Sequence, residues 1–450
     1  MTLRSTDARY WYPSSNEPAV DGVTLRVEPG SFVLLTGPTG CGKSTWLRLA
    51  GGLLQHHGTG RVDGAIELGG TPVDRIPPSE RIRHLGFVSQ TPHDQVVSGV
   101  VGDEVAFGLE SAGVTQRAIE PLIRDALARV ELDVNHNRST DALSGGQLAR
   151  LVVAAAIAGS PTLLLLDEPL AQLDPQGADA LLRVLRAIAD QGTAVVMVEH
   201  RIRLVKDTVD RIVVMDGGRI IGEGLSHLGT VGLGVELPRV GPAGTPGREL
   251  IAASDLRHRY EDAPTDALGG VDFRVASGER VAIMGPNGSG KSTLLRALAG
   301  WIDAGPVTRN GRVIDVPQDP DLALFCPTVR AELEYGPSEY GAAPNELRDR
   351  TSALADALNI ANLLDRAPQS LSRGQRLRVA VGAAMSVQPD VLLLDEPTSG
   401  QDRREVARLM NALTSTSTDG AVVFATHDEE LARAAATRIV RMDGGRVVDS

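Results

Sequence analysis

The sequence predicts an α/β protein built from two tandem copies of one domain, and two observations support this fold class. First, VTLRVEPGSFVLLTGPTGCGKSTWLRLAGG (residues 23–52) recurs as VDFRVASGERVAIMGPNGSGKSTLLRALAG (residues 271–300). A repeat period far above about 50 residues indicates two copies of a domain rather than a solenoid. Second, each copy alternates uninterrupted apolar strands with helices, which is the pattern of a mostly parallel sheet covered on both faces.

The spacing of the repeats locates the domains. The offset between copies is 248 in the first block but 228 at the later pair DALSGGQ and QSLSRGQ, so the second copy is about 20 residues shorter. The first copy carries an extra polar, Gly-rich strand-and-turn segment at 60–77. Residues 229–248 contain six glycines and three prolines, and a flexible linker of this length reaches roughly 25 Å. We therefore expect one domain at 1–228, a linker at 229–248 and a second domain at 249–450.

The later apolar segments are expected to form the sheet core. The stretch 151–166 is interrupted by Ser160-Pro161 and predicts a helix followed by a buried strand. Continuous apolar strands are expected at 163–166 and 194–198, and again at 391–394 and 421–425.

Composition narrows the class of protein. Hydrophobic residues make up 42% and charged residues 23%, as in soluble globular proteins. No apolar run approaches the roughly 18 residues that span a bilayer, and the N-terminus lacks the apolar core of a secretory signal. The two cysteines, Cys41 and Cys326, are compatible with a reducing cytoplasm. A net charge of −12 argues against nonspecific nucleic-acid binding.

Two glycine-rich loops carry the clearest chemistry. GPTGCGKS and GPNGSGKS both fit the phosphate-binding pattern G-x-x-x-x-G-K-S/T, each after an apolar strand and before a helix. Their backbone N–H groups can wrap phosphates, and they hold Lys43 and Lys291, two of only three lysines in the chain. Cys41 within the first loop is interpreted as a tolerated small residue rather than a redox switch. The residues expected to bind nucleotide in these loops are Gly37, Pro38, Thr39, Gly40, Cys41, Gly42, Lys43, Ser44, Thr45, Gly285, Pro286, Asn287, Gly288, Ser289, Gly290, Lys291, Ser292 and Thr293.

An Asp-Glu-Pro triplet follows the same buried strand in each copy. Asp167 and Asp395 end these strands, at the carboxyl edge of the sheet, where ligands of open α/β sheets bind. We expect both to lie on the Mg²⁺ side, with the hydroxyls of Ser44 and Ser292 as Mg²⁺ ligands. The next residues are expected to be the catalytic bases that orient and deprotonate the attacking water, Glu168 and Glu396. A lone acid after a strand can simply cap a helix, but the repeated triplet favours the catalytic interpretation.

LSGGQ and LSRGQ complete the set of motifs, and with them the chain resembles the ABC ATPase family across both halves. The resemblance implies P-loop domains with a β-subdomain and a helical signature subdomain. It also implies that ATP and Mg²⁺ are sandwiched between the two halves of the same chain, with each signature completing the P-loop site of the other half. The signature residues expected to contact nucleotide are Ser144, Gly145, Gly146, Gln147, Ser372, Arg373, Gly374 and Gln375.

Other family elements are carried over by position. Gln90 and Gln318 match the Q-loop glutamines, which contact the metal site in the family. The D-loops correspond to Leu173-Asp174 and Gln401-Asp402, and the catalytic switch histidines to His200 and His427. The aromatic residues that stack on adenine correspond to Tyr12 and Tyr260, the former beside the alternatives Tyr10 and Trp11.

Three classes of tandem ABC chains lack membrane spans. Translation-type factors have a long basic linker, whereas this one is short and nearly uncharged; sugar-importer ATPases tend to have one degraded P-loop, whereas both are intact here. The energy-coupling-factor (ECF) group of vitamin and metal importers fits better, because GFVSQTPHDQVVSGVVGDEVAFG (86–108) and DVPQDPDLALFCPTVRAELEYG (315–336) resemble its Q-loop region. The second has Leu322 and Ala323 where the first has Asp94 and Gln95, which bears on whether both halves dock their partner equally.

The ECF resemblance implies an ATP-hydrolysing subunit at the cytoplasmic face of a bacterial cell membrane. Its expected partners are a transmembrane coupling protein and a membrane-embedded substrate-binding protein, with no nucleic acid. No direct lipid binding is expected, since no basic amphipathic helix is present. A soluble factor acting on ribosomes or nucleic acid, and the ATPase of a conventional small-molecule importer, remain the alternatives.

The two ATP sites are expected to be unequal. In the arrangement that the ABC resemblance implies, the site at Lys291 pairs with Gly145-Gly146, whereas the site at Lys43 pairs with Arg373-Gly374. An arginine where glycine allows close approach to phosphate could obstruct the site, point outward or add charge. Two active sites of differing rate are therefore predicted, with the Lys291 site the more active.

Overall fold

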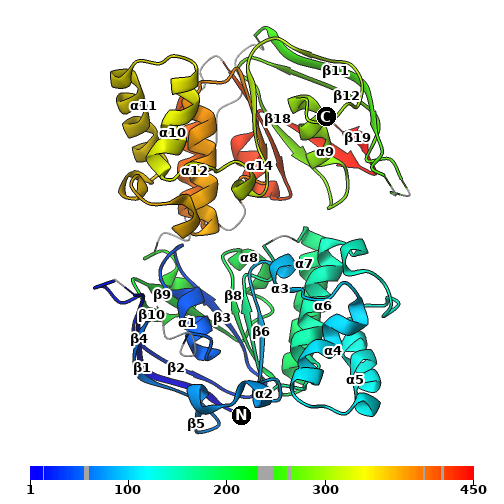
Figure 1. Ribbon diagram of the computed structural model, residues 1–450, viewed down its shortest axis with the longest axis vertical. Helices are drawn as coiled ribbons and strands as arrows, with labels where there is room; N and C mark the ends of the chain where they lie inside the picture. The colour runs from blue at the N-terminus through cyan, green and yellow to red at the C-terminus, as the bar shows by residue number, and fades with distance from the viewer. Residues whose placement is uncertain are drawn as a thin grey trace. The chain divides into compact units, whose positions relative to one another are not determined.

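The computed structural model divides into two compact units, Met1–Gly234 and Val235–Ser450, each an α/β domain as predicted (Figure 1). The described residues are 1–13, 15–54, 60–171, 173–231, 247–261, 263, 265–398, 401–416 and 420–449. Most of the predicted linker at 229–248 therefore lies outside the described residues.

The core of the first unit is a mostly parallel sheet. Its strand order, within the described residues, is β10-β9-β3-β8-β7-β6, with β10 antiparallel to β9 and the others parallel. Alternate residues of β7 enter opposite cores: Leu164 and Leu166 join one buried cluster, Leu163 and Leu165 the other. Burial on both faces explains the continuous apolar run. The bounds are β3 (Phe32–Thr36), β6 (Leu85–Val88), β7 (Leu163–Asp167), β8 (Ala194–Val198), β9 (Arg211–Asp216) and β10 (Arg219–Glu223).

The second unit repeats this sheet in the order β15-β16-β17-β13-β18-β19 over its described residues, with β19 the antiparallel strand. β16 is buried in the same alternating way, with Leu392 and Leu394 on one side and Val391 and Leu393 on the other. The bounds are β13 (Arg280–Met284), β15 (Val313–Val316), β16 (Val391–Asp395), β17 (Ala421–Thr426), β18 (Arg438–Asp443) and β19 (Arg446–Asp449).

A separate antiparallel sheet flanks each core sheet. The predicted extra segment at 60–77 forms β4, β5 and the 3₁₀ helix η2 (Val73–Arg75), whereas the second unit has the short β14 next to β11. The bounds are β1 (Leu3–Trp11), β2 (Val20–Val27), β4 (Arg61–Leu68), β5 (Thr71–Pro72), β11 (Glu249–His258), β12 (Leu268–Ala276) and β14 (Val307–Arg309).

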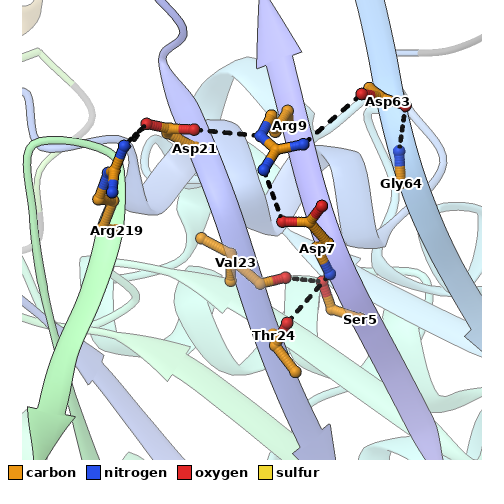
Figure 2. A network of polar contacts seen from close by, with 9 residues as sticks. All are labelled: Ser5, Asp7, Arg9, Asp21, Val23, Thr24, Asp63, Gly64 and Arg219. Atoms are coloured by element: carbon orange, nitrogen blue, oxygen red, sulfur yellow. Dashed lines mark hydrogen bonds and ion pairs between the residues drawn. The ribbon is translucent and has the colours of Figure 1, made fainter.

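Ion pairs join the antiparallel sheet of the first unit to its core sheet (Figure 2). Arg9 on β1 contacts Asp21 on β2 at 3.2 Å and Asp63 on β4 at 3.6 Å. Asp21 also pairs with Arg219 of β10 at 2.5 Å. These side chains are partly exposed, so each pair contributes little alone. Of these three pairs, Asp21–Arg219 is the one that joins the antiparallel sheet to the core sheet.

One helix follows the glycine-rich loop of each unit: α1 (Lys43–Ala50) in the first and α9 (Lys291–Ala299) in the second. Three further helices of each unit pack together as a helical subdomain, α4 to α6 in the first unit and α10 to α12 in the second. Segment 151–166 forms the end of α6 followed by β7, as predicted. The remaining bounds are α2 (Pro78–Arg81), α3 (Pro92–Gln95), α4 (Val101–Ser111), α5 (Gln116–Arg129), α6 (Gly145–Ile157), α7 (Pro175–Asp190), α8 (Ile202–Val205), α10 (Val329–Glu339), α11 (Pro344–Ala357), α12 (Arg373–Ser386), α13 (Arg403–Thr416) and α14 (Glu429–Ala435).

None of the helices in the described residues has the length and apolar character needed to cross a bilayer.

Candidate functional site

Parallel strands bring the predicted residues of the first unit to one sheet edge. Gln90 follows β6, Glu168 follows β7, and His200 follows β8. Because these strands run in register in the same direction, their carboxyl ends meet. Gln90 Nε2 donates to Glu168 Oε2 at 2.8 Å, and His200 Nε2 lies 3.0 Å from Glu168 Oε1. The structure thus joins three side chains that lie up to 110 positions apart in the sequence.

The glycine-rich loop of the first unit begins after β3 at the same edge. Gly42 precedes α1 at φ +100°, and a Cβ there would lie 2.1 Å from Ala19 O. A Cβ at Gly37 would lie 2.1 Å from Met215 O. Backbone atoms fill the space that side chains would need, so glycine is required at both positions. Lys43 folds back over the loop, and its Nζ donates to Gly37 O at 2.9 Å and Pro38 O at 2.8 Å.

Cys41 lies in this loop, buried beside Lys43. Burial raises the pKa of the Cys41 thiol, and the charge of Lys43 only partly opposes this. A buried thiol of raised pKa is a poor nucleophile. This favours the interpretation of Cys41 as a small packing residue.

Asp167 is a buried carboxylate next to the start of α1. Its Oδ1 accepts a hydrogen bond from Ser44 Oγ at 2.7 Å. Burial and the charge of Glu168 raise the pKa of Asp167 to about 6, against the effect of that hydrogen bond. A bound cation would relieve this unfavourable burial, and Mg²⁺ prefers oxygen ligands such as these.

Glu168 has an unusual backbone conformation. Its φ is +48°, in the left-handed region that non-glycine residues rarely adopt. Its N–H donates to Val198 O at 3.0 Å, which continues the pairing of β7 with β8 past the strand end. Burial raises the pKa of Glu168, but His200, Lys43 and Gln90 outweigh this and hold it below its usual value. Strain of this kind is characteristic of functional sites.

The second unit builds the same arrangement. Gly290 precedes α9 at φ +101°, and Lys291 Nζ donates to Gly285 O at 2.8 Å and Pro286 O at 3.0 Å. Glu396 repeats the left-handed conformation, with φ +49°.

The acidic residues of the second unit also repeat those of the first. Burial raises the pKa of Asp395, opposed by a hydrogen bond from Ser292, while the charge of Glu396 raises it further. His427 Nδ1 lies 3.0 Å from Glu396 Oε1, so a different ring nitrogen faces the glutamate than in the first unit.

The two units differ at the Q-loop glutamine. In the first unit, Gln90 donates to Glu168 Oε2. In the second, Glu396 Oε2 is buried and has no hydrogen-bond partner within the described residues. The contact at Gln318 is made by its backbone: the Gln318 carbonyl accepts a hydrogen bond from Arg373 Nη2 at 3.1 Å. The Arg373 side chain is therefore directed at the Q-loop of its own unit.

The structure distinguishes Tyr12 from its aromatic neighbours. Tyr10 is fully buried, and Arg61 stacks on Trp11 at 3.8 Å, whereas Tyr12 is 40% exposed. Tyr12 Oη lies 3.1 Å from Thr45 Oγ1, beside the start of α1. In the second unit, Tyr260 is similarly exposed and its Oη lies 3.4 Å from Thr293 Oγ1. Both hydroxyls thus lie beside the first turn of the helix that follows the glycine-rich loop.

The signature residues begin the long helix of each helical subdomain. Ser144 caps α6, and Gln147 returns a hydrogen bond to its backbone. Ser372 and Gln375 repeat this capping box at α12. The first turn of such a helix presents free N–H groups that attract anions, including phosphate. The glycines of these turns are Gly145, Gly146 and Gly374.

The predicted D-loop aspartates are also helix caps. Asp174 Oδ1 accepts from Gly177 N at 2.8 Å at the start of α7. Asp402 Oδ1 accepts from Arg404 N and Glu405 N at the start of α13. Leu173 and Gln401, which precede these caps, are buried.

Sequence reasoning missed two buried glutamates that hold the Q-loop segments. Glu104 Oε2 accepts from the backbone N–H groups of Val97 and Ser98, both at 2.9 Å. Glu332 Oε1 accepts from Cys326 N at 2.5 Å in the second unit. Both lie in the first turn of a helix, at the same offset of 228. Their matching positions in the two copies of the repeat were the signal in the sequence that could have identified them.

The residues present fit a magnesium nucleotide. Within the described residues, no group of three or more His, Cys, Asp or Glu side chains could hold a metal alone. Mg²⁺ in nucleotide sites usually takes one or two protein ligands and completes its shell with phosphate oxygens and water. Ser44 with Asp167, and Ser292 with Asp395, provide that kind of partial site. In the glycine-rich loops next to them, a side chain at Gly37, Gly42, Gly285 or Gly290 would meet a backbone carbonyl.

Comparison with known proteins agrees with this geometry. Residues 20–171 and 268–399 match the ABC transporter family. A protein from Methanosarcina mazei, provisionally named an ABC transporter ATP-binding protein, is 35% identical over 98% of this chain and 87% of its own length. A Streptomyces coelicolor protein of the same provisional description is 32% identical over 99% of this chain and 93% of its own.

Solved structures resemble the whole chain in fold. An archaeal ribosome recycling factor in complex with a ribosomal stalk protein matches 98% of this chain and 89% of its own, with a TM-score of 0.66 and 21% identity. An RNase-L inhibitor gives a TM-score of 0.64 at 20% identity, over 98% of this chain and 89% of its own. At such identity the likeness concerns the fold alone. The motifs, the geometry and the family match together identify the chain as a member of the ABC transporter ATPase family with two tandem ATPase domains, and hence as an ATP-hydrolysing enzyme.

Proposed function

We propose that the chain is the energising subunit of an ECF-type importer, which binds Mg²⁺–ATP at two sites and couples its hydrolysis to a separate transmembrane protein. The observation that carries this proposal is the repeated convergence of each P-loop with an Asp-Glu pair and a histidine at one sheet edge. Glu168 contacts Gln90 and His200, and Glu396 contacts His427. Both copies of the sequence keep the P-loop lysine and the Asp-Glu pair.

Each residue has a proposed role. Lys43 and Lys291 would neutralise the terminal phosphates, and the adjacent serines with Asp167 and Asp395 would hold Mg²⁺, which would supply charge stabilisation. Glu168 and Glu396 orient the attacking water and accept its proton. The lowered pKa of Glu168 keeps its carboxylate ionised at neutral pH, so that it can accept a hydrogen bond from the attacking water. The histidines hold these glutamates in position.

Family resemblance further supports composite sites. Ser144 and the turn that follows it would complete the site at Lys291, and Ser372 and its turn the site at Lys43. Both serines are exposed, so both helix starts are accessible to a phosphate from outside their own unit.

A repeated exposed apolar pair supports a protein partner. Val97 and Phe107 in the first unit are 62% and 53% exposed; Val97 lies in the loop before α4, and Phe107 lies within α4. Phe325 and Tyr335 occupy the same positions in the second unit, with ring centroids 4.9 Å apart. Exposed apolar surface at one site in both copies indicates an interaction surface. We assign it to the transmembrane coupling protein.

Membrane recruitment tests this assignment. The chain is co-expressed with the membrane proteins encoded beside its gene, and its sedimentation with membranes is measured. The double variant Phe107→Ser, Tyr335→Ser is expected to remain largely in the supernatant. Trp301→Ser, which alters a still more exposed aromatic outside the pair, is the control and is expected to sediment like the wild type.

Two outcomes would contradict the proposal. Undiminished sedimentation of the double variant would remove the apolar pair from the interface. Tight, saturable binding of the wild type to ribosomal particles, with no recruitment to membranes, would favour a soluble factor acting on ribosomes.

A further inference from the structure

The signature helix of the second unit carries two arginines that the first unit lacks. Arg373 stands where the first unit has Gly145, and Arg376 where it has Leu148. Both lie in the first two turns of α12, on the side that approaches the Q-loop of the same unit.

Both arginines contact that loop. Arg373 Nη2 donates to Gln318 O at 3.1 Å. Arg376 Nε lies 2.8 Å from Asp321 Oδ1, an ion pair without hydrogen-bond alignment, while its Nη1 donates to Leu371 O at 2.9 Å. The guanidinium of Arg376 therefore bridges the first residue of the LSRGQ motif to the 3₁₀ turn η5 (Pro320–Leu322).

The first unit holds its Q-loop in a different way. There the Gln95 side chain accepts from Ser89 N at 2.7 Å and donates to Phe87 O at 2.8 Å, so the loop is braced by one of its own residues. The second unit has Ala323 at the position of Gln95, and Asp321 at the position of His93. The contacts of Gln95 have no counterpart at Ala323, and the signature helix supplies two contacts to this loop instead.

We propose that Arg373 and Arg376 are positioning residues that tie the Q-loop of the second unit to the start of α12, so that the two segments move together. This inference rests on the proposed function, in which Gln318 belongs to the ATP site at Lys291 and Ser372 to the site at Lys43. ATP at Lys291 then influences the signature that serves Lys43. The first unit lacks side chains for the same tie, because Gly145 and Leu148 carry no charge.

The Arg376–Asp321 ion pair should be weak enough to break during ATP turnover. The side chain of Arg376 is 22% exposed and that of Asp321 is 55% exposed. Partly exposed ion pairs shift a local equilibrium by about two- to fivefold. Such a tie biases the position of the loop and does not lock it.

A charge swap tests the tie in the nucleotide-free full chain. Hydrogen exchange of the backbone amides is followed by mass spectrometry in Arg376→Asp, in Asp321→Arg and in the double variant. Each single variant is expected to exchange about two- to fivefold faster across residues 318–324, and the double variant to return toward the wild-type rate. Unchanged exchange in both single variants, or no recovery in the double variant, would overturn the tie.

The control is another exposed ion pair of the same subdomain. Arg330 lies 3.3 Å from Asp365 and does not contact the Q-loop segment 318–324 through this pair. Arg330→Asp is expected to leave exchange across 318–324 at the wild-type rate. Equal acceleration by Arg330→Asp would show a general loosening of the subdomain and would contradict the specific tie.

Adding Mg²⁺–ATP tests the coupling. In the wild type, ATP is expected to slow exchange at the start of α12, and Arg376→Asp is expected to lose that response while the charge-swapped chain recovers it. A response that persists in Arg376→Asp would overturn the coupling even if the tie exists. Absence of ATP hydrolysis by the wild type would instead contradict the proposed function and leave the nucleotide-free result standing.

Discussion

Replacing the buried Asp167 by Asn should stabilise the nucleotide-free protein while it removes ATPase activity at that site. Asp167 is 1% exposed, and burial with the charge of Glu168 raises its pKa from 3.8 to about 6. The folded state therefore binds a proton more tightly than the unfolded state does. Stability falls as the pH rises from about 4 to 6, and the full penalty is present above the folded-state pKa.

The size of the penalty follows from the pKa shift. A rise from 3.8 to about 6 corresponds to about 3 kcal/mol at pH 7. Asn has nearly the same shape and carries no charge, and its carbonyl can still accept the hydrogen bond from Ser44. For a unit of this size, about 3 kcal/mol corresponds to a rise in Tm of roughly 6–12 °C.

Thermal unfolding of wild type and Asp167→Asn is compared at pH 7 and near pH 4 in EDTA, alongside Mg²⁺–ATP hydrolysis. The rise in Tm caused by Asp167→Asn should be present at pH 7 and nearly absent near pH 4. Asp210→Asn is the control, and it is expected to lower the Tm at pH 7. Partial burial raises the pKa of Asp210, but the hydrogen bond from Phe32 N and the contact with Arg186 hold it below its usual value. A lower Tm for Asp167→Asn at pH 7 would refute the reasoning.

The remaining predictions concern the loops, the asymmetry of the sites and the membrane. Gly42→Ala places a Cβ 2.1 Å from Ala19 O at φ +100°, and we expect it to lower the Tm of the first unit by more than Gly40→Ala, which meets open space at φ +81°; equal losses would contradict the steric argument. Lys291→Ala should reduce ATP turnover in the assembled transporter more than Lys43→Ala, and equal losses would remove the predicted asymmetry. The chain without its partner should not float with anionic liposomes at physiological salt, and flotation would show direct lipid binding.

Much of the fold could be predicted because burial on both faces leaves a clear pattern. The run that forms β7 is apolar at every position, since alternate leucines enter different cores. The turns of the glycine-rich loops were equally evident, because Gly37 and Gly42 are packed against backbone carbonyls that exclude any side chain. Such features depend on local sequence, and they repeat in the second unit.

Other features depend on contacts that local sequence does not reveal. The orientation of Arg373 is decided by the Gln318 carbonyl, which lies 55 positions away. Glu104 resembles a solvent-exposed acid on a helix, yet it is buried because the loop before it turns two N–H groups inward. The conformation of Glu168 arises because its N–H continues the pairing with β8. Each of these required knowledge of which segments meet in space.

The central claim is that Glu168 and Glu396 act as bases at two intact ATP sites, and trapping of unhydrolysed nucleotide tests it most directly. The chain carrying Glu168→Gln and Glu396→Gln is incubated with Mg²⁺–ATP, and the bound nucleotide is identified and counted. We predict that it retains ATP at both P-loops with affinity close to that of the wild type, because the bases act on water and contribute little to binding. Hydrolysis should fall by about 10²–10⁴-fold. Poor ATP binding, or hydrolysis at the wild-type rate, would contradict the account.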